Sequence, residues 1–375
     1  MEPKIALLNL DNFKDINESY RLEVGDAILI QFADRLSKLE STNVKAYRLS
    51  GDIFALLACG NITLKSLQSL SRDFARSLEK NNFIVDDINL SISVTIGLAA
   101  GQYKLLSHAE IAHLNAKKNN KGYAIFDEEL PAYKEMIENI QITKEIRSAI
   151  SHNNILLFGQ KIINNQSQEE KYEALMRIRS EDGRIISPFF FLEQAKKAKL
   201  YPELSRSIIK QACHYFKDRE SAFSINLMIE DIKNEKTIAF LFDTLKKTNT
   251  AKRVILEIVE SEAIETFKEV EDFIQDAKAL GCKVAIDDFG TGYSNFEYIT
   301  RLNIDILKID GSLIKNIHID KNTHLAVKTI VNFAQVLNLE VVAEFVHCEE
   351  VQQIVKDLGV TYSQGYLFHQ PEQLG

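Results

Sequence analysis

The C-terminal part of this chain alternates between short apolar runs and amphipathic helical stretches, and this alternation limits the fold more than any other feature. It repeats about eight times over roughly 220 residues, which is typical of a barrel of eight strands and eight helices. The predicted helical stretches include Pro188–Lys199, Glu203–Lys217, Glu269–Gly281, Thr323–Asn338 and Cys348–Gly359. We therefore expect an α/β fold built on a (β/α)8-type barrel.

These apolar runs end in polar residues. The ends are Tyr172-Glu173, Ile225-Asn226, Leu256-Glu257, Ile286-Asp287-Asp288, Leu307-Lys308 and Ala343-Glu344. Because the carboxyl ends of barrel strands converge on one mouth, we expect these polar side chains to meet there. Buried carboxylates need a counter-charge or a metal. Taken alone, Asp287 and Asp288 could be ordinary helix-capping residues at a strand end, but the recurrence of the pattern favours a metal site.

The ligand types narrow the choice of metal. All the candidates are carboxylate or amide oxygens, which favours Mg²⁺ or Mn²⁺ over Zn²⁺ or copper. The carboxylates exceed what one divalent ion needs, so we expect two ions about 3.5–4 Å apart that share an aspartate and activate a water. Lys308 would orient that water or neutralise charge in the transition state. The alternative is a surface charge pair between Lys308 and Asp310.

The same residues carry a resemblance to a known family. The motifs are YEALMR (172–177), SINL (224–227), LEIVES (256–261), AIDDFGTGYS (285–294), DILKIDGSLI (305–314), VVAEFV (341–346) and YSQGYLF (362–368). In this order they resemble the EAL domains, bacterial phosphodiesterases that hydrolyse cyclic di-GMP to linear pGpG. The resemblance covers roughly residues 140–371. It implies a metal-dependent hydrolase whose substrate is cyclic di-GMP.

The resemblance also implies roles for individual residues. The implied metal ligands are Glu173, Asn226, Glu257, Asp287, Asp288 and Glu344. Lys308 matches the lysine that orients the water, and Gln364 matches a residue that completes the metal-bound water network. Gln160 and Arg177 match residues that contact the nucleotide. Glu260 matches the glutamate that holds the loop after Asp288 in its working shape.

The chain departs from the family pattern in three places. The family usually has Ala-Glu-Gly-Val-Glu where this chain has Ala-Glu-Phe-Val-His, so Phe345 replaces a glycine and His347 replaces a carboxylate. Lys161 stands where a proline normally follows the strand glutamine. We expect these changes to affect the rate and the pH dependence more than the chemistry. We interpret His347 as a loop residue at the barrel rim, with metal ligation as the alternative.

The N-terminal part has its own alternation of strands and helices. The expected elements are a strand Lys4–Asp11, a helix Glu23–Glu40, a hairpin Val44–Cys59, a helix Leu64–Asn81, a strand Ile88–Ala100 and a helix Ala109–Asn120. The motifs LNLDNFKDIN (8–17), VGDAIL (24–29), YRLSGDIFALL (47–57) and NAKKNNKG (115–122) resemble the GGDEF domain, the diguanylate cyclase that makes cyclic di-GMP from GTP. We expect a smaller α+β domain with a central mixed sheet.

The chemical residues of that family are altered here. The signature Gly-Gly-Asp-Glu-Phe is Ser50-Gly51-Asp52-Ile53-Phe54, and the first metal-binding aspartate is Asn9. Further changes lie at Arg21-Leu22, Ser41 and Val44, and the helix that normally precedes the first strand is missing. We therefore expect a degenerate domain without cyclase activity. Asn17, Asp26, Lys117 and Lys121 match nucleotide-contacting positions, which leaves GTP binding possible.

The expected organisation is a degenerate, N-terminally truncated GGDEF domain over residues 1–128, a helical linker over 129–152 and an EAL domain over 153–375. The linker is charged and lacks a Gly or Ser run, so it should be a semi-rigid spacer. Within the EAL domain we expect a homodimer contact at the loop Gly290–Asn295 and the following helix, where Phe296 and Tyr298 would be exposed.

Composition excludes several other classes. The net charge of −8 argues against a partner that is a nucleic-acid polymer. The 4 cysteines are widely spaced with no CxxC, which predicts reduced thiols in the cytoplasm. No apolar run reaches the ~18 residues that span a bilayer, and no signal-peptide pattern opens the chain.

Three functions remain open. The first is a metal-dependent cyclic di-GMP phosphodiesterase regulated by its inactive GGDEF domain. The second is a receptor that binds cyclic di-GMP without hydrolysis. Such receptors usually lose a ligand or the lysine, and the complete set here favours the enzyme. A bifunctional cyclase and phosphodiesterase is disfavoured by Asn9 and Ile53. The sequence does not define the regulatory input.

Overall fold

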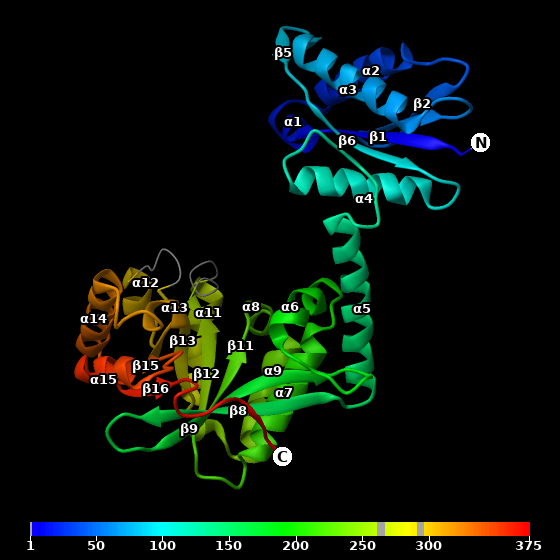
Figure 1. The fold of residues 1–375 in the computed structure, drawn as a ribbon. Helices are drawn as coiled ribbons and strands as arrows, with labels where there is room; N and C mark the ends of the chain where they lie inside the picture. Colours follow the sequence, from blue (N-terminus) through cyan, green and yellow to red (C-terminus); the bar gives the residue numbers. More distant parts are fainter. Residues whose placement is uncertain (1, 261–266, 291–295) are drawn as a thin grey trace. The chain divides into compact units, whose positions relative to one another are not determined.

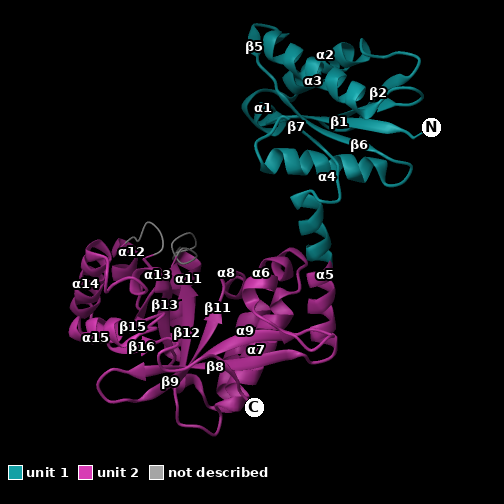
Figure 2. Ribbon diagram, viewed as in Figure 1, with its two compact units in different colours: residues 1–140 teal, residues 141–375 magenta. Residues whose placement is uncertain are grey.

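The chain divides into two compact units, residues 1–140 and 141–375 (Figure 2). The structure is a computed structural model that describes residues 2–260, 267–290 and 296–375. The division falls within the long helix α5 (Pro131–Ser151), which covers most of the stretch predicted as a linker. The finer boundaries at residues 128 and 152 remain predictions.

Unit 1 is built on a mixed five-stranded sheet in the order β2-β3-β1-β6-β7. Its strands are β1 (Lys4–Leu10), β2 (Val44–Ser50), β3 (Ile53–Ala58), β6 (Val94–Ala100) and β7 (Tyr123–Ile125). Strand β1 pairs antiparallel with β3 and β6, whereas β6 and β7 are parallel. The helices are α1 (Phe13–Ser19), α2 (Leu22–Ser37), α3 (Leu64–Lys80) and α4 (Leu105–Lys118).

Both faces of this sheet are covered, which explains the continuous apolar run Ile5–Leu8 in its central strand β1. Helices α2 and α3 lie on one face and α4 lies on the other (Figure 1). Successive strand residues point to opposite faces. Ala6 and Leu8 therefore join the larger core beneath α2 and α3, while Ile5 and Leu7 pack towards Ala109 of α4. The predicted α+β domain with a mixed sheet is confirmed.

The predicted strand Ile88–Ala100 is wrong in one respect, because it is two strands in two sheets. Strand β5 (Ile88–Leu90) pairs with β4 (Phe83–Val85) in a separate hairpin, and the main-sheet strand begins only at Val94. The residues between them leave the ladder. Both pieces are extended and share a period of two, so alternation alone could not separate them.

Unit 2 contains a closed barrel of eight strands. They are β8 (Ile155–Asn164), β9 (Glu170–Arg179), β11 (Phe223–Leu227), β12 (Val254–Val259), β13 (Lys283–Phe289), β14 (Ile306–Ile309), β15 (Glu340–Ala343) and β16 (Tyr362–Gln364). Closure comes from β8, which pairs with both β16 and β9. The short strands β10 (Ile185–Ile186) and β17 (Glu372–Gln373) extend the sheet.

One strand of the barrel runs against the others. Strand β8 is antiparallel to both of its neighbours, whereas the strands from β9 through β16 pair in parallel. Only residues 165–169 join β8 to β9, and a connection that short makes a hairpin, since a parallel crossover needs a dozen or more residues. The predicted barrel is confirmed with this one reversal.

Helices surround the barrel. They are α6 (Pro188–Lys197), α7 (Tyr201–Tyr215), α8 (Ile229–Ile232), α9 (Glu235–Thr248), α11 (Phe267–Ala279), α12 (Phe296–Arg301), α13 (Gly311–Ile314), α14 (Lys321–Val336) and α15 (Glu349–Asp357), with a 3-10 turn at Ala251–Arg253. The five helices predicted from the sequence agree with α6, α7, α11, α14 and α15 to within two residues at each end. In the described part of the chain, none of the helices has the length and apolar character needed to cross a membrane.

Candidate active site

An apolar layer inside the barrel determines where the polar residues lie. Its members come from six different strands and are Ile162, Ile255, Ala285, Ile306, Val342 and Tyr362. On the parallel strands, the residue two places further on points to the same inner face, one layer nearer the mouth. Those residues are Glu257, Asp287, Lys308, Glu344 and Gln364. On the reversed strand β8 the order is inverted, so Gln160 precedes Ile162.

Lys308 lies at the centre of this polar layer and is 1% exposed. Its Nζ lies 2.8 Å from Glu344, 2.9 Å from Glu257, 2.9 Å from Asp287 and 3.9 Å from Glu173. The alternative of a surface pair with Asp310 is therefore wrong, because a fully buried ammonium already has four carboxylates around it. Their attraction outweighs burial, which would lower the pKa of Lys308, and the net pKa is well above its usual value.

Amide groups hold Glu173 in place. Asn226 Nδ2 donates to one of its carboxylate oxygens at 2.7 Å, and Gln364 Nε2 donates to the other at 2.6 Å. Gln364 also donates to Gln160 Oε1 at 3.1 Å, so four of the predicted site residues form one network. Burial raises the pKa of Glu173, but Lys308 and these two amides outweigh burial and leave the net pKa lowered.

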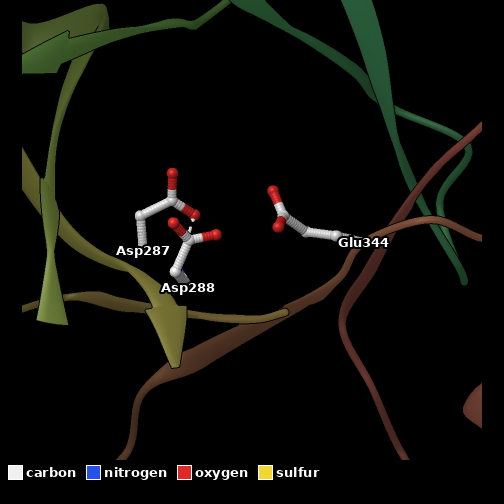
Figure 3. A group of neighbouring side chains, drawn as sticks. All are labelled: Asp287, Asp288 and Glu344. Atoms are coloured by element: carbon white, nitrogen blue, oxygen red, sulfur yellow. Dashed lines mark hydrogen bonds between the residues drawn. The ribbon is translucent and has the colours of Figure 1, made fainter. Parts of the chain in front are cut away.

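Asp287 and Asp288 are neighbours in sequence, yet both contribute to one cluster with Glu344 (Figure 3). One oxygen from each of the three lies within 4.8 Å of the others. A regular strand would point consecutive side chains to opposite faces. Here Asp288 adopts a left-handed backbone, with φ of 56°, and the pairing of β13 with β14 shifts register between Ile286 and Phe289. This irregularity brings both aspartates to the mouth.

The cluster holds more negative charge than its lysine neutralises. Burial, together with the nearby Asp287 and Asp310, raises the pKa of Asp288 to about 6. Burial likewise raises the pKa of Glu257 to about 8 and that of Glu344 well above its usual value, despite the opposing effect of Lys308. Carboxylates crowded in this way favour protons or cations. An all-oxygen set with this charge fits divalent Mg²⁺ or Mn²⁺, so the predicted ligands fit the predicted metals.

Glu260 lies where the following loop begins. Its Oε2 accepts a hydrogen bond from the backbone N–H of Gly290 at 3.1 Å, directly after Asp288-Phe289. This contact ties the end of β13 to the end of β12. The rest of the predicted dimer loop, residues 291–295, lies outside the described residues. After the loop, Phe296 is 37% exposed, as predicted, and its ring packs on Phe333. Tyr298 is half-buried, so the prediction that it is exposed is wrong.

A cavity of about 360 Å³ opens beside the carboxylates. It is lined by Gln160, Glu173, Leu175, Arg177, Asp310, Gly311, Glu344, Phe345, His347, Gln364, Gly365, Tyr366 and Pro371. The two predicted nucleotide contacts, Gln160 and Arg177, are both among them. Sequence reasoning missed Tyr366 as a lining residue, although it lies two places after Gln364 and therefore follows the same strand end. Arg177 donates to the carbonyl of Met176 at 2.7 Å and is half-buried.

Two of the departures from the family pattern lie at the rim. His347 is exposed, and its Nδ1 lies 3.3 Å from the carbonyl oxygen of Phe345. It is not in the metal-type cluster found among the described residues, which agrees with the interpretation as a rim residue. Lys161 pairs with Glu170 at 3.0 Å on the hairpin β8–β9.

The altered positions of unit 1 lie together in its sheet. Asn9 and Ile53 are direct partners in the ladder between β1 and β3, so the two lost carboxylates of the family pattern would have faced the same place. Gly51 has φ of 49° in the hairpin turn between Ser50 and Asp52, and its carbonyl accepts a hydrogen bond from Arg48. Asp11 accepts hydrogen bonds from Ser93 and Thr95 at 2.7 Å each.

Comparison with models of known families matches residues 143–371 to the EAL domain and residues 3–122 to "Diguanylate cyclase, GGDEF domain". Among curated proteins, the chain is 29% identical over 391 residues to "Cyclic di-GMP phosphodiesterase PdeB" of Shewanella oneidensis, a match covering 99% of this chain and 45% of that protein. It is 27% identical over 388 residues to "Bifunctional diguanylate cyclase/cyclic di-GMP phosphodiesterase MucR" of Pseudomonas aeruginosa, covering 98% and 55%. The chain thus spans about half the length of these relatives.

Solved structures give the same fold for unit 2. The "PaMucR Phosphodiesterase, c-di-GMP complex" matches with a TM-score of 0.59 and 27% identity, covering 62% of this chain and 97% of that one. An EAL domain protein from Listeria monocytogenes matches with a TM-score of 0.56 and 28% identity, covering 61% and 93%.

Proposed function

Because this chain belongs to the EAL domain family and carries a GGDEF domain ahead of its barrel, we propose that it hydrolyses cyclic di-GMP to linear pGpG at the barrel mouth. The observation that carries the proposal is the convergence of four of the six predicted ligands, Glu173, Glu257, Asp287 and Glu344, around a buried lysine. Names of relatives support the substrate, since PdeB and MucR are both called cyclic di-GMP phosphodiesterases.

Two Mg²⁺ or Mn²⁺ ions would be held by Glu173, Asn226, Glu257, Asp287, Asp288 and Glu344. When bound, such ions supply an activated water and neutralise charge on the phosphate. The oxygens of Asp287, Asp288 and Glu344 are already close enough together to share a cation. Amide donors from Asn226 and Gln364 orient Glu173 for the same purpose, as outer hydrogen bonds commonly do for ligands.

Lys308 acts as a fixed cation and hydrogen-bond donor. The surrounding carboxylates hold the pKa of Lys308 well above its usual value, which favours the role of a proton-bearing donor over that of a general base. Its place among the carboxylates suits it to orient the attacking water and to stabilise charge that develops on the phosphate. Gln160 and Arg177 line the cavity beside the carboxylates, where the nucleotide would bind, and the half-buried guanidinium suits a phosphate.

Unit 1 would serve as a regulatory module without cyclase activity. Cyclase chemistry needs carboxylates to hold metal. The paired positions Asn9 and Ile53 do not supply a carboxylate. GTP binding at unit 1 and a homodimer through the EAL domain belong to the same proposal. Glu260 would couple that dimer contact to the site, because its carboxylate accepts a hydrogen bond from the backbone N–H of Gly290 at the start of the loop.

The test is incubation of the chain with cyclic di-GMP and either Mg²⁺ or Mn²⁺, with pGpG resolved by chromatography. We expect turnover that excess chelator abolishes and Ca²⁺ inhibits, since Ca²⁺ is larger and tolerates looser coordination. Full activity in chelator would remove the metal mechanism. Binding of cyclic di-GMP without turnover would favour the receptor hypothesis instead.

A further inference from the structure

Phe345 is a bulky residue held in a backbone conformation that favours glycine. Its φ is 58°, in the left-handed region, where a non-glycine residue is strained. Its ring is not stabilised by burial either, because the residue is 53% exposed. The left-handed backbone of Phe345 costs stability, and a ring that is half exposed gains little burial to offset that cost, so core packing does not explain an aromatic residue at this position.

The surroundings hold the strained turn in place. Val346 N–H donates to the carbonyl of Gln364 at 2.9 Å, and Leu367 N–H donates to the carbonyl of Val346 at 3.1 Å. Gly365 packs so closely that an added Cβ would lie 2.0 Å from the Val346 carbonyl oxygen. At Gly311, an added Cβ would lie 2.7 Å from Phe345 Cβ. Because residue 311 is a glycine, there is enough space for the side chain of Phe345.

Phe345 lines the cavity beside the carboxylates. Phe345 follows Glu344 directly, and both line that cavity together with Arg177 and Asp310. The Nζ of Lys315 lies 5.7 Å from the centre of the ring, which keeps a positive charge near this wall. An exposed flat apolar surface beside phosphate-binding groups suits a nucleotide base, which stacks on aromatic side chains through its π-face.

We propose that Phe345 binds one guanine base of the substrate by stacking and thereby positions the phosphodiester at the carboxylates. This deepens the proposed phosphodiesterase function and rests on it. Stacking that is present equally in the ground state and the transition state lowers KM without changing kcat. Phe345 is thus a positioning residue and not part of the hydrolytic chemistry.

The test compares wild type with Phe345→Gly, Phe345→Leu and Phe345→Tyr, measuring KM and kcat for pGpG formation, the Kd of cyclic di-GMP in Ca²⁺, and Tm. We expect Phe345→Gly and Phe345→Leu to raise KM and Kd about tenfold with kcat within about twofold. Phe345→Tyr keeps the ring and should retain the wild-type KM. Tm of Phe345→Gly should not fall, because glycine adopts this φ without strain.

Each outcome separates the two proposals. Wild-type turnover with an unchanged KM in Phe345→Gly would overturn the stacking and leave the phosphodiesterase intact. A wild type that binds without turnover, with Kd raised in Phe345→Gly, would overturn the hydrolysis and keep the stacking. A wild type that neither binds nor cleaves cyclic di-GMP would overturn both. A lower Tm together with a lower kcat in Phe345→Gly would make Phe345 a structural residue.

Discussion

The two units of this chain differ in what their strand ends carry. In unit 2, successive barrel strands bring Glu257, Asp287 and Glu344 to within 3 Å of one lysine. In unit 1, the corresponding signature positions of its own family are the neutral pair Asn9 and Ile53. Both units nevertheless have complete cores and closed or covered sheets.

The comparison shows that unit 1 keeps its core and sheet although two of its signature positions are altered. The core of unit 1 packs around Phe32, Phe54 and Phe74. Of these, only Phe54 belongs to the signature, and it is a core residue there. Losing carboxylates there removes charge repulsion and costs no core packing. In unit 2 the crowded carboxylates oppose folding, so their retention points to function. Function has to be argued from each site separately.

Removing a ligand from unit 2 should have the largest effect. Glu173→Ala deletes a carboxylate, leaves Asn226 Nδ2 without this acceptor and leaves Gln364 Nε2 with only Gln160. We expect pGpG formation to fall at least about 100-fold, since loss of supporting residues alone typically costs 10–100-fold. Glu170→Ala, on the same strand and exposed, is the matched control and should keep its activity. Equal loss in both variants would contradict the assignment.

Replacing the central lysine separates chemistry from binding. Lys308→Ala should lower kcat about 100- to 1000-fold while KM changes little, because the role proposed for Lys308 is in the transition state. The measurement is the kcat and KM of pGpG formation at saturating Mn²⁺, where the added cation compensates the unpaired carboxylates. If KM rose and kcat stayed intact, Lys308 would be a substrate-binding residue.

Much of unit 2 could be predicted from sequence because strand ends and chemistry coincide there. The apolar run before Asp287 identified both a strand and a site, and the barrel geometry brought distant runs together. The left-handed backbone of Asp288 could not be read from the run, since alternation places it on the opposite face. The same limit merged β5 and β6 into one strand. Phe345 was visible as a departure from the family, but its strain was not.

Removing unit 1 tests whether its loss of chemistry left a regulatory role. We compare the full chain with a chain that begins near Tyr133, each with and without GTP, and measure pGpG formation. Coupling between sites typically amounts to about 5- to 150-fold, transmitted here through α5. Equal rates in all four reactions would make unit 1 a passive appendage. Detectable synthesis of cyclic di-GMP would contradict the reading of Asn9 and Ile53.

The smallest effect is on stability, and it follows from the raised pKa values of unit 2. The pKa of Asp288 rises from 3.8 to about 6 and that of Glu257 from 4.5 to about 8. A carboxyl whose pKa is raised by folding stabilises the protein below its unfolded pKa, and this stabilisation is lost as pH rises through the folded pKa. The pKa of Glu173 is lowered by folding, so its contribution to stability changes with pH only below about pH 4.5. This range lies below the one in which Asp288 and Glu257 titrate.

In chelator, Tm should therefore fall by at least about 5 °C between pH 5 and pH 8, and Asp288→Asn should remove the smaller share of that fall, because Glu257 titrates over more of this range. Adding Mn²⁺ should raise Tm more at pH 8 than at pH 5, because bound metal needs deprotonated carboxylates. Unit 1 supplies the internal comparison, since its signature positions Asn9 and Ile53 carry no carboxylate. Residues 1–128 alone should show neither the fall nor the rescue by Mn²⁺. A Tm in chelator that stayed flat from pH 5 to pH 8 in wild type and Asp288→Asn alike would show that the carboxylates of the barrel mouth do not oppose folding, and the contrast between the two units would then lose its energetic basis.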